Sequence, residues 1–274
     1  MDEVKKIITA DRVWLDLINE VKQGSKVNPR EMETFEKVNH TTMCSMNHPI
    51  VTHRARDLGY KFMVKEAYWI LSGDNKVSTI SPYSTMINRF SDDGYFFHGA
   101  YGPKIIDQLS YICRALADDR DTRQAVLNIW RESPPKTNDV PCTISIQFII
   151  RNDKLSVIAN MRSNDVWLGW PYDNFNFSML GIYVSLLLND IYRIRARPGL
   201  TIINAASRHL YKKNLSAANA CTSSFDFVDY APFNIDDYYK FEDYSGAQVF
   251  LNHLNNVLDS SSTGFASEFF TQTV

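Results

Sequence analysis

The sequence has few cysteines, and their spacing suits neither a metal site nor a disulfide framework. Its 274 residues include four, at positions 44, 113, 142 and 221, with no CxxC pair among them. This density is far below that of a disulfide-bonded scaffold. The six histidines form no HxxxH or HExxH pattern either. These absences predict reduced thiols, a cytosolic protein and no metal site.

Long hydrophobic runs and excess positive charge are also missing. The longest apolar runs, such as residues 182–188, are too short to cross a bilayer, and the charged N-terminus lacks the apolar segment of a signal peptide. The formal net charge is −2, so no broad basic field indicates a nucleic-acid partner. We expect a soluble protein that binds neither membrane nor nucleic acid. A local arginine cluster could still bind a short anion.

The chain also lacks repeats and a clear linker, while its hydrophobic content of 45% is ample for a large core. We therefore predict one α+β domain over residues 1–274, with a loose tail after about residue 260. Hydrophobic periodicity predicts helices at 4–22, 60–71, 105–116, 175–192, 215–221 and from about 245. Strands are predicted at 50–52, 125–130, 144–150, 155–159 and 199–205, and a loop or irregular strand at 28–48. Residues 175–192 are apolar on nearly every face, which indicates a helix buried in the core.

The stretch from Val140 to Phe177 concentrates chemically active side chains. It contains Cys142, then Arg162 and Ser163, and the two aspartates Asp165 and Asp173. A positive charge near a thiol favours the thiolate, and an arginine beside a serine suits a phosphate. Alone, a cysteine in an apolar strand more often packs in the core. The combination predicts a nucleophile beside an anion site.

Ordered motifs give this stretch a family context. Pro141-Cys142, Arg162-Ser163-x-Asp165, Gly169-x-Pro171 and His209-x-Tyr211 follow one another, preceded by Glu66 in KEAYWILSGD, by Tyr101-Gly102 and by Asp121-x-Arg123. With the arginine twenty positions after the cysteine, the chain resembles the thymidylate synthase family from roughly residue 30 to 243. The resemblance implies that family's three-layer α+β fold, with a mixed β-sheet, a long buried helix and a homodimer.

The resemblance also implies a reaction. The substrate would be a pyrimidine nucleoside monophosphate, and 5,10-methylenetetrahydrofolate would be the co-substrate. Cys142 would add to C6 of the base, which makes C5 electron-rich enough to attack the folate methylene group. Glu66 would relay protons through water, and Tyr101 would assist proton removal from C5.

Binding roles follow from the same resemblance. Arg30, Arg162 and Ser163 would bind the phosphate, together with Arg123 reaching across a dimer. His209 and Tyr211 would bind the sugar 3′-hydroxyl. Asp165 would hold the pterin ring, with Ile87 and Tyr172 also on the folate side. Gln124 stands where many synthases have a second arginine, which removes one charge from the phosphate site.

Asp173 is a departure from the synthases, which carry asparagine there. Cytosine offers an amino donor at C4 and an acceptor at N3, and uracil reverses both. A carboxyl with one shared proton matches cytosine, whereas unpaired polar groups against uracil cost about 1–3 kcal/mol. Asp173 therefore predicts a cytosine substrate, as in the dCMP hydroxymethylases of phages and the CMP hydroxymethylases of nucleoside-antibiotic pathways. The alternative is a one-residue slip, with Asn174 or Asn176 reading the base.

A second departure concerns the reaction's last step. Ile87 and Phe90 stand where synthases carry a tryptophan pair. A smaller side chain leaves room for water to add to the methylene, giving a hydroxymethyl group. The sequence thus predicts a folate-dependent (d)CMP 5-hydroxymethylase in the cytoplasm of a bacterium or of a phage-infected host. A dCMP methyltransferase, a dUMP-using thymidylate synthase and an idle nucleotide- or RNA-binding relative remain alternatives, as does the choice between dCMP and CMP.

Overall fold

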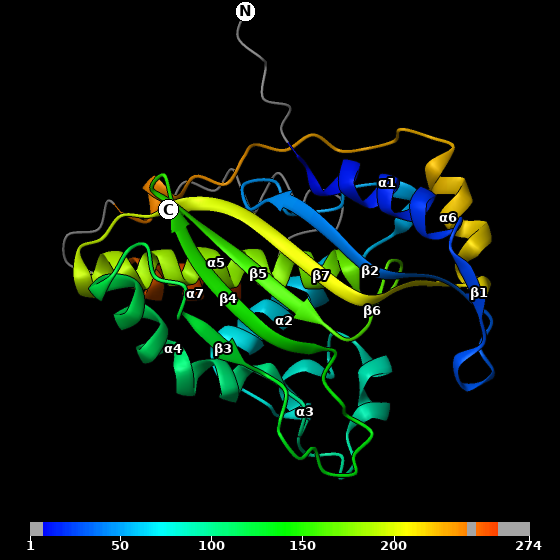
Figure 1. Ribbon diagram of the computed structural model, residues 1–274, viewed down its shortest axis with the longest axis horizontal. Helices are drawn as coiled ribbons and strands as arrows, with labels where there is room; N and C mark the ends of the chain where they lie inside the picture. The colour runs from blue at the N-terminus through cyan, green and yellow to red at the C-terminus, as the bar shows by residue number, and fades with distance from the viewer. Residues whose placement is uncertain (1–7, 240–244, 257–274) are drawn as a thin grey trace, which may run out of the picture.

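A mixed β-sheet forms one layer of the protein (Figure 1). The computed structural model describes residues 8–239 and 245–256, so the tail predicted to be loose lies outside the described residues. Within these ranges seven strands pair in the order β1-β2-β7-β5-β4-β3, with β6 beside β7. Their bounds are Ser25–Val27, Thr34–Ser45, Val126–Asn128, Thr143–Arg151, Lys154–Met161, Asn164–Asp165 and Arg197–Tyr211, from β1 to β7. Two pairs, β5–β7 and β6–β7, are parallel, and the other pairs are antiparallel.

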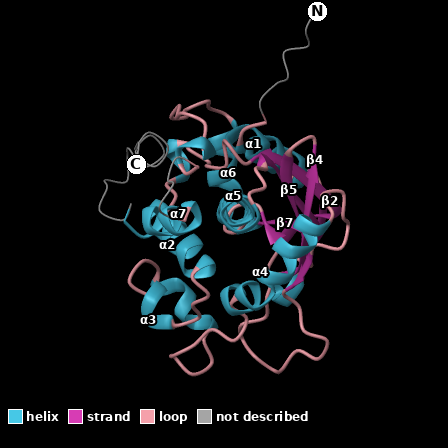
Figure 2. Ribbon diagram, turned by 90° about the vertical axis from the view of Figure 1, so that its left-hand side faces the viewer, coloured by secondary structure: helices cyan, strands magenta, loops and turns pink. Residues whose placement is uncertain are grey.

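Helix α5, Trp170–Tyr192, lies between the sheet and a second layer of helices (Figure 2). It is the crossover that a parallel β5–β7 pair requires. Helices α2, Tyr60–Leu71, and α7, Gly246–Asn256, pack on its other side. Being covered from both sides explains why this helix is apolar nearly all round. The predicted α+β fold, with three layers and a long buried helix, is confirmed.

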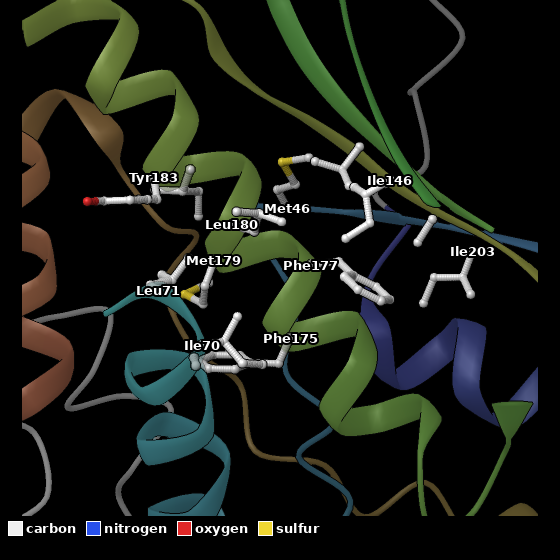
Figure 3. Close-up of a cluster of buried hydrophobic side chains, with 14 of the residues drawn as sticks. Met46, Ile70, Leu71, Ile146, Phe175, Phe177, Met179, Leu180, Tyr183 and Ile203 are labelled. Carbon is white, nitrogen blue, oxygen red and sulfur yellow. The ribbon is translucent and has the colours of Figure 1, made fainter. Parts of the chain in front are cut away.

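The two faces of α5 divide the core between the layers. Phe177 points toward Ile146 and Ile203 of the sheet, whereas Phe175 points toward Ile70 of α2 (Figure 3). Gly181 allows the closest approach, because a Cβ there would lie 2.7 Å from Met46 Cε and 2.8 Å from Val157 Cγ2. These contacts fix the height of α5 over the sheet and so position its first turn.

The remaining helices surround these layers. They are α1, Ala10–Val21; α3, Val77–Ile80; α4, Tyr101–Asp118; and α6, Leu215–Thr222. Short 3-10 turns are η1, Pro29–Glu31; η2, Arg54–Arg56; η3, Thr85–Phe90; η4, Lys212–Asn214; and η5, Ile235–Asp237. None of the helices in the described ranges is long and apolar enough to cross a membrane.

One predicted element was wrong, and another had been left open between a loop and a strand. Most of the segment 28–48, predicted as a loop or irregular strand, is the twelve-residue strand β2. Its threonines and lysine obscured the pattern because one face of the strand is exposed, with Val38 and Met43 outside. Residues 50–52 form no strand, since Ile50 N donates to the Tyr230 hydroxyl and Thr52 N to Asp11 Oδ1 instead of to a neighbouring strand.

The end of β7 and the start of α5 differ from the prediction, and both differences change the element in which residues of the predicted site lie. Strand β7 continues to Tyr211, six residues past its predicted end, so His209 and Tyr211 both lie within the strand. Helix α5 starts at Trp170, five residues before the predicted start, with Pro171 in its first turn. Asp173 therefore lies in the first turn of the buried helix.

Candidate active site

The β4–β5 hairpin brings Cys142 and Arg162 together. Cys142 directly precedes β4 and Arg162 directly follows β5, and Arg162 N donates to Cys142 O at 2.9 Å. The Arg162 guanidinium donates from Nε to Pro141 O at 2.9 Å and from Nη2 to Val140 O at 3.0 Å. It is thereby held against the segment that carries the thiol, while its side chain stays exposed.

Burial and charge act on the Cys142 thiol in opposite directions. Burial raises the pKa of the thiol, Arg162 and Arg30 lower it, and Asp173 raises it further. The predicted activating effect of Arg162 is present, but burial outweighs it and the net pKa lies above the ordinary value. In the free protein Cys142 is therefore a neutral thiol at pH 7.

Two further acid–base groups belong to this site, Tyr101 beside the thiol and Glu66 beside Asp173. Burial raises the pKa of Glu66, on α2, to about 7, and its Oε2 accepts a hydrogen bond from Asn176 Nδ2 at 2.7 Å. Burial also raises the pKa of Tyr101, at the start of α4, with Asp173 and Cys142 adding to the shift. The Tyr101 hydroxyl accepts from Thr143 N at 3.2 Å, next to the thiol in sequence. A carboxyl that titrates near pH 7 suits proton transfer.

Asp173 faces the same group of side chains from the first turn of α5. Burial and the neighbouring Glu66 raise its pKa to about 8, although the side chain is partly open to solvent. Its Oδ2 accepts from Asn164 Nδ2 at 2.6 Å. The two asparagines of the one-residue-slip alternative are engaged elsewhere, Asn174 with Pro49 O at 2.9 Å and Asn176 with Glu66. The arrangement therefore favours Asp173 over either amide as the group near the thiol.

Asp165 and His209 are paired across β6 and β7. Asp165 Oδ1 accepts from Trp167 N at 2.7 Å and from Leu168 N at 3.0 Å. Its Oδ2 is buried without a hydrogen-bond partner among the described residues, as is His209 Nδ1. Since buried polar atoms are normally paired, these two atoms suit a ligand's polar groups. An unpaired carboxylate oxygen fits the ring N–H donors of a pterin.

The other predicted folate-side residues lie on separate elements. The Tyr172 hydroxyl, one residue before Asp173, accepts from Gly59 N at 3.1 Å, and its ring meets Phe62 edge-on at 5.4 Å. Ile87 lies in η3, half-buried against the core. Its place beside a folate stays a prediction.

The predicted phosphate residues are only partly gathered. Ser163 adjoins Arg162, and Arg30 is close enough for its charge to lower the Cys142 pKa. Arg30 has φ of 52°, a left-handed conformation that non-glycine residues adopt at a cost and often near functional sites. Arg123 is exposed beyond the C-terminus of α4, and its carbonyl oxygen accepts from Gln147 Nε2 at 2.8 Å, five residues along β4 from Cys142 and so about 16 Å away. Within one subunit Arg123 is thus remote from the thiol.

Sequence reasoning missed two residues that contact this site. Asn164 and Arg208 are both buried, and Arg208 Nη1 donates to Asn164 Oδ1. Arg208 stands directly before the motif histidine, His209, in a part of β7 where residues 208–210 are all buried. An arginine at an inward position was the available signal. Among the described residues no cluster of three or more histidines, cysteines or carboxylates could hold a metal ion.

Comparison with known proteins places this geometry in a family. Residues 12–252 match the family model described as thymidylate synthase. The chain belongs to the thymidylate synthase family. The hairpin with Cys142 and Arg162, the Glu66 helix and the Asp165–His209 pair all lie within the matched range, so the predicted family is confirmed.

Three curated phage relatives, each named deoxyuridylate hydroxymethyltransferase, are similar to this chain. The protein of Bacillus phage SP01 is 30% identical over 181 residues, 58% of this chain and 47% of the relative. That of Pseudomonas phage M6 is 34% identical over 140 residues, 47% and 40% of the two chains. That of Delftia phage PhiW-14 is 33% identical over 135 residues, 43% and 38%. The chain spans less than half the length of each of these relatives.

Proposed function

We propose that this protein is a folate-dependent 5-hydroxymethyltransferase of a pyrimidine nucleoside monophosphate, and that the base is cytosine. The observation that carries the proposal is the position of Asp173 between the two other groups: its charge raises the pKa of the Cys142 thiol, and the charge of Glu66 raises the pKa of Asp173 in turn. The hydroxymethyltransferase names of the phage relatives support the reaction class.

The reaction uses these groups in sequence. Cys142 Sγ bonds to C6 of the base, and the thiol proton leaves through Glu66 and solvent. C5 then bonds to the folate methylene carbon as one of the two folate nitrogens on that carbon departs. Tyr101 assists removal of the C5 proton, and the second folate nitrogen leaves, which releases tetrahydrofolate and forms the exocyclic methylene. Water adds to this methylene while the Sγ–C6 bond breaks. The products are a 5-hydroxymethyl nucleotide and tetrahydrofolate.

The binding groups orient both substrates for this sequence. Arg162, Ser163 and Arg30 bind the nucleotide phosphate, and His209 and Tyr211 take the sugar 3′-hydroxyl. Asp165 holds the pterin ring through its unpaired buried Oδ2, with Tyr172 and Ile87 on the same side. These contacts would bring the folate methylene to C5 of the base and the thiol to C6. Ile87, smaller than a tryptophan, leaves space for the water that completes the product.

The cytosine assignment depends on the protonation of Asp173. With a pKa of about 8, its carboxyl is mostly neutral at pH 7 and offers one donor and one acceptor. The acceptor takes the cytosine amino group and the donor meets N3. Above pH 8 the carboxylate loses its donor, and the match to a neutral cytosine weakens.

Uracil is the second candidate base. The names of all three phage relatives specify deoxyuridylate, and a neutral carboxyl with its proton on the other oxygen would match uracil O4 and N3–H. The two assignments differ only in which carboxyl oxygen carries the proton. They are separated by testing both nucleotides directly.

A homodimer in the cytoplasm completes the proposal. Arg123 lies beside Gln147 of β4, away from its own thiol, which suits a contact with the phosphate bound by a second subunit. Val38 and Met43 on β2 and Ile144 on β4 are exposed large hydrophobic side chains of the sheet. An apolar sheet face of this kind is suited to burial against a second copy.

Product mass tests the proposed function. The protein is incubated with methylenetetrahydrofolate and dCMP, CMP or dUMP, and each nucleotide product is weighed by mass spectrometry. We expect a hydroxymethylated cytidine nucleotide and tetrahydrofolate, and no product with Cys142→Ala. Product from dUMP alone contradicts the cytosine assignment. A methylated nucleotide with dihydrofolate contradicts the hydration step.

A further inference from the structure

A buried arginine lies behind Asp173 and has no role in the reaction sequence above. Arg208 is on β7, one residue before His209, and its side chain is fully buried. Burial lowers the pKa of its guanidinium to about 9, which leaves it charged at neutral pH. An arginine side chain has five N–H donors and no acceptor, and burying its charge is costly. Its position therefore calls for a specific partner.

Arg208 is connected to Asp173 by two hydrogen bonds, with Asn164 between them. Arg208 Nη1 donates to Asn164 Oδ1, and Nη2 donates to Ile203 O at 2.9 Å. Asn164, itself buried, donates from Nδ2 to Asp173 Oδ2 at 2.6 Å. Arg208, Asn164 and Asp173 thus form a chain of hydrogen bonds, here called the carboxyl relay, from β7 through β6 to α5.

The hydrogen bonds of the carboxyl relay can run in only one direction, from Arg208 to Asn164 to Asp173. Because Arg208 cannot accept a hydrogen bond, Asn164 must turn its carbonyl oxygen toward Arg208 and its amide N–H toward Asp173. Oδ2 of Asp173 is therefore an acceptor in either protonation state. A proton on this carboxyl then belongs on Oδ1.

This polarity matters because a free neutral carboxyl discriminates poorly between pyrimidines. It can donate from either oxygen, so one arrangement matches cytosine and the other matches uracil. The pKa of Asp173, about 8, means that the neutral form is the major one at pH 7. Fixing the proton on one oxygen leaves a single complementary base edge.

We propose that Arg208 and Asn164 are positioning residues that make the two oxygens of Asp173 inequivalent and so set the base selectivity of the enzyme. The inference rests on the proposed function, because it requires Asp173 to face the base. It holds whichever of the two bases is preferred. Asn164 acts through Asp173, and Arg208 acts through Asn164.

The test measures the ratio of kcat/KM for dCMP to kcat/KM for dUMP in the full chain. Arg208→Met removes the donors and lets the Asn164 amide rotate, and Asn164→Leu removes the donor to Asp173. Each change is expected to move the ratio about tenfold toward one, the effect of losing one matched buried hydrogen bond. Arg208→Lys keeps a charged donor and is expected to retain more of the wild-type selectivity than Arg208→Met.

Thr201→Val is the matched control. Thr201 is buried on the same strand as Arg208 and bonds Ser178, on the same helix as Asp173, at 2.6 Å. Its loss perturbs the β7–α5 packing without touching the carboxyl relay, so the ratio should stay at the wild-type value. Thermal melting identifies which variants are folded, and Asn164→Leu and Arg208→Lys extend the test if Arg208→Met does not fold.

The outcomes separate the two proposals. Folded, active relay variants that keep the wild-type ratio overturn the role of the carboxyl relay alone. A wild-type preference for dUMP that weakens in these variants supports the relay and contradicts the cytosine assignment. A wild-type protein that converts neither nucleotide contradicts the proposed function, and the relay inference with it.

Discussion

Asn176 on α5 donates a hydrogen bond to Glu66 on α2, with 2.7 Å between Nδ2 and Oε2. The contact joins α5, which carries Asp173, to α2, which carries Glu66. Burial raises the pKa of Glu66 to about 7, and the bond from Asn176 acts against that rise because it stabilises the charged carboxylate. The pKa of this carboxyl thus depends on one amide.

Asn176→Leu tests that dependence. Without the amide donor the carboxylate is less stable, so the pKa of Glu66 rises above its wild-type value. If Glu66 works as a base, the low-pH limb of kcat/KM moves to higher pH. Ser185→Ala, at another buried position on α5, is the control and should leave the limb in place. If the low-pH limb of kcat/KM is unchanged or moves to lower pH in Asn176→Leu, the assignment of this limb to Glu66 is contradicted.

Arg162→Met tests the charge beside the thiol. The Arg162 guanidinium lowers the Cys142 pKa, so its removal reduces the thiolate fraction at a fixed pH. We expect alkylation of Cys142 by iodoacetamide at pH 8 to slow about three- to tenfold, as followed by mass spectrometry. The other three cysteines are buried, which makes Cys142 the first to react.

Arg151→Met is the control for that measurement, because Arg151 lies at the opposite end of the same hairpin. It should leave the alkylation rate of Cys142 unchanged. An equal effect of the two substitutions would mean that the rate responds to net charge, and an unchanged rate in Arg162→Met would contradict the local effect.

Asp173→Asn should stabilise the fold at high pH. The carboxyl has a pKa of about 8 when folded, against a model value of 3.8, so the folded state binds the proton more tightly. Wild-type stability therefore decreases as pH rises from about 4 to 8, and the substitution removes this loss. We expect a gain of about 1–3 kcal/mol in the free energy of unfolding at pH 9 relative to pH 5.

Urea unfolding at the two pH values measures that gain. Asp121→Asn, which changes an exposed aspartate, provides the comparison. A gain that is the same at pH 5 and pH 9 would contradict a protonated Asp173 in the folded protein.

Ile87→Trp tests the role of side-chain volume in the last step. If space beside the exocyclic methylene admits water, a tryptophan should exclude it and divert the intermediate toward reduction by the folate. We expect methylated nucleotide and dihydrofolate to appear in the product mixture, whereas Ile87→Leu should give the wild-type product. A hydroxymethyl product of unchanged yield from Ile87→Trp contradicts the role given to this position.

The sequence was most informative where local pattern and tertiary environment agree. Helix α2 has its predicted bounds, 60–71, and the all-apolar pattern of α5 reflects real burial on every side. The contact of Cys142 with Arg162 also follows from sequence, because the Asn152-Asp153 turn lies almost midway between them. A register shift between Thr143 and Ser145 absorbs the one-residue difference between the two arms.

The rest depended on tertiary contacts that no local pattern encodes. The segment of β2 was left open between a loop and an irregular strand because its outward face mixes Thr41 with Val38 and Met43 and its inward face includes Thr34 and Thr42. The buried position of Arg208 contradicts the usual exposure of arginine, and its guanidinium is satisfied there by Asn164 from β6 and by Ile203 O. Burial also outweighs the guanidinium at Cys142, a balance that cannot be computed from spacing alone.

The central claim is that Asp173 reads a cytosine edge. Its most direct test is competition between dCMP and dUMP at equal concentration, with methylenetetrahydrofolate, followed by the mass of both products. The account predicts that hydroxymethylated dCMP dominates for the wild type and that Asp173→Asn shifts the preference to dUMP. A wild-type product made mainly from dUMP, or a ratio that Asp173→Asn leaves unchanged, would contradict it.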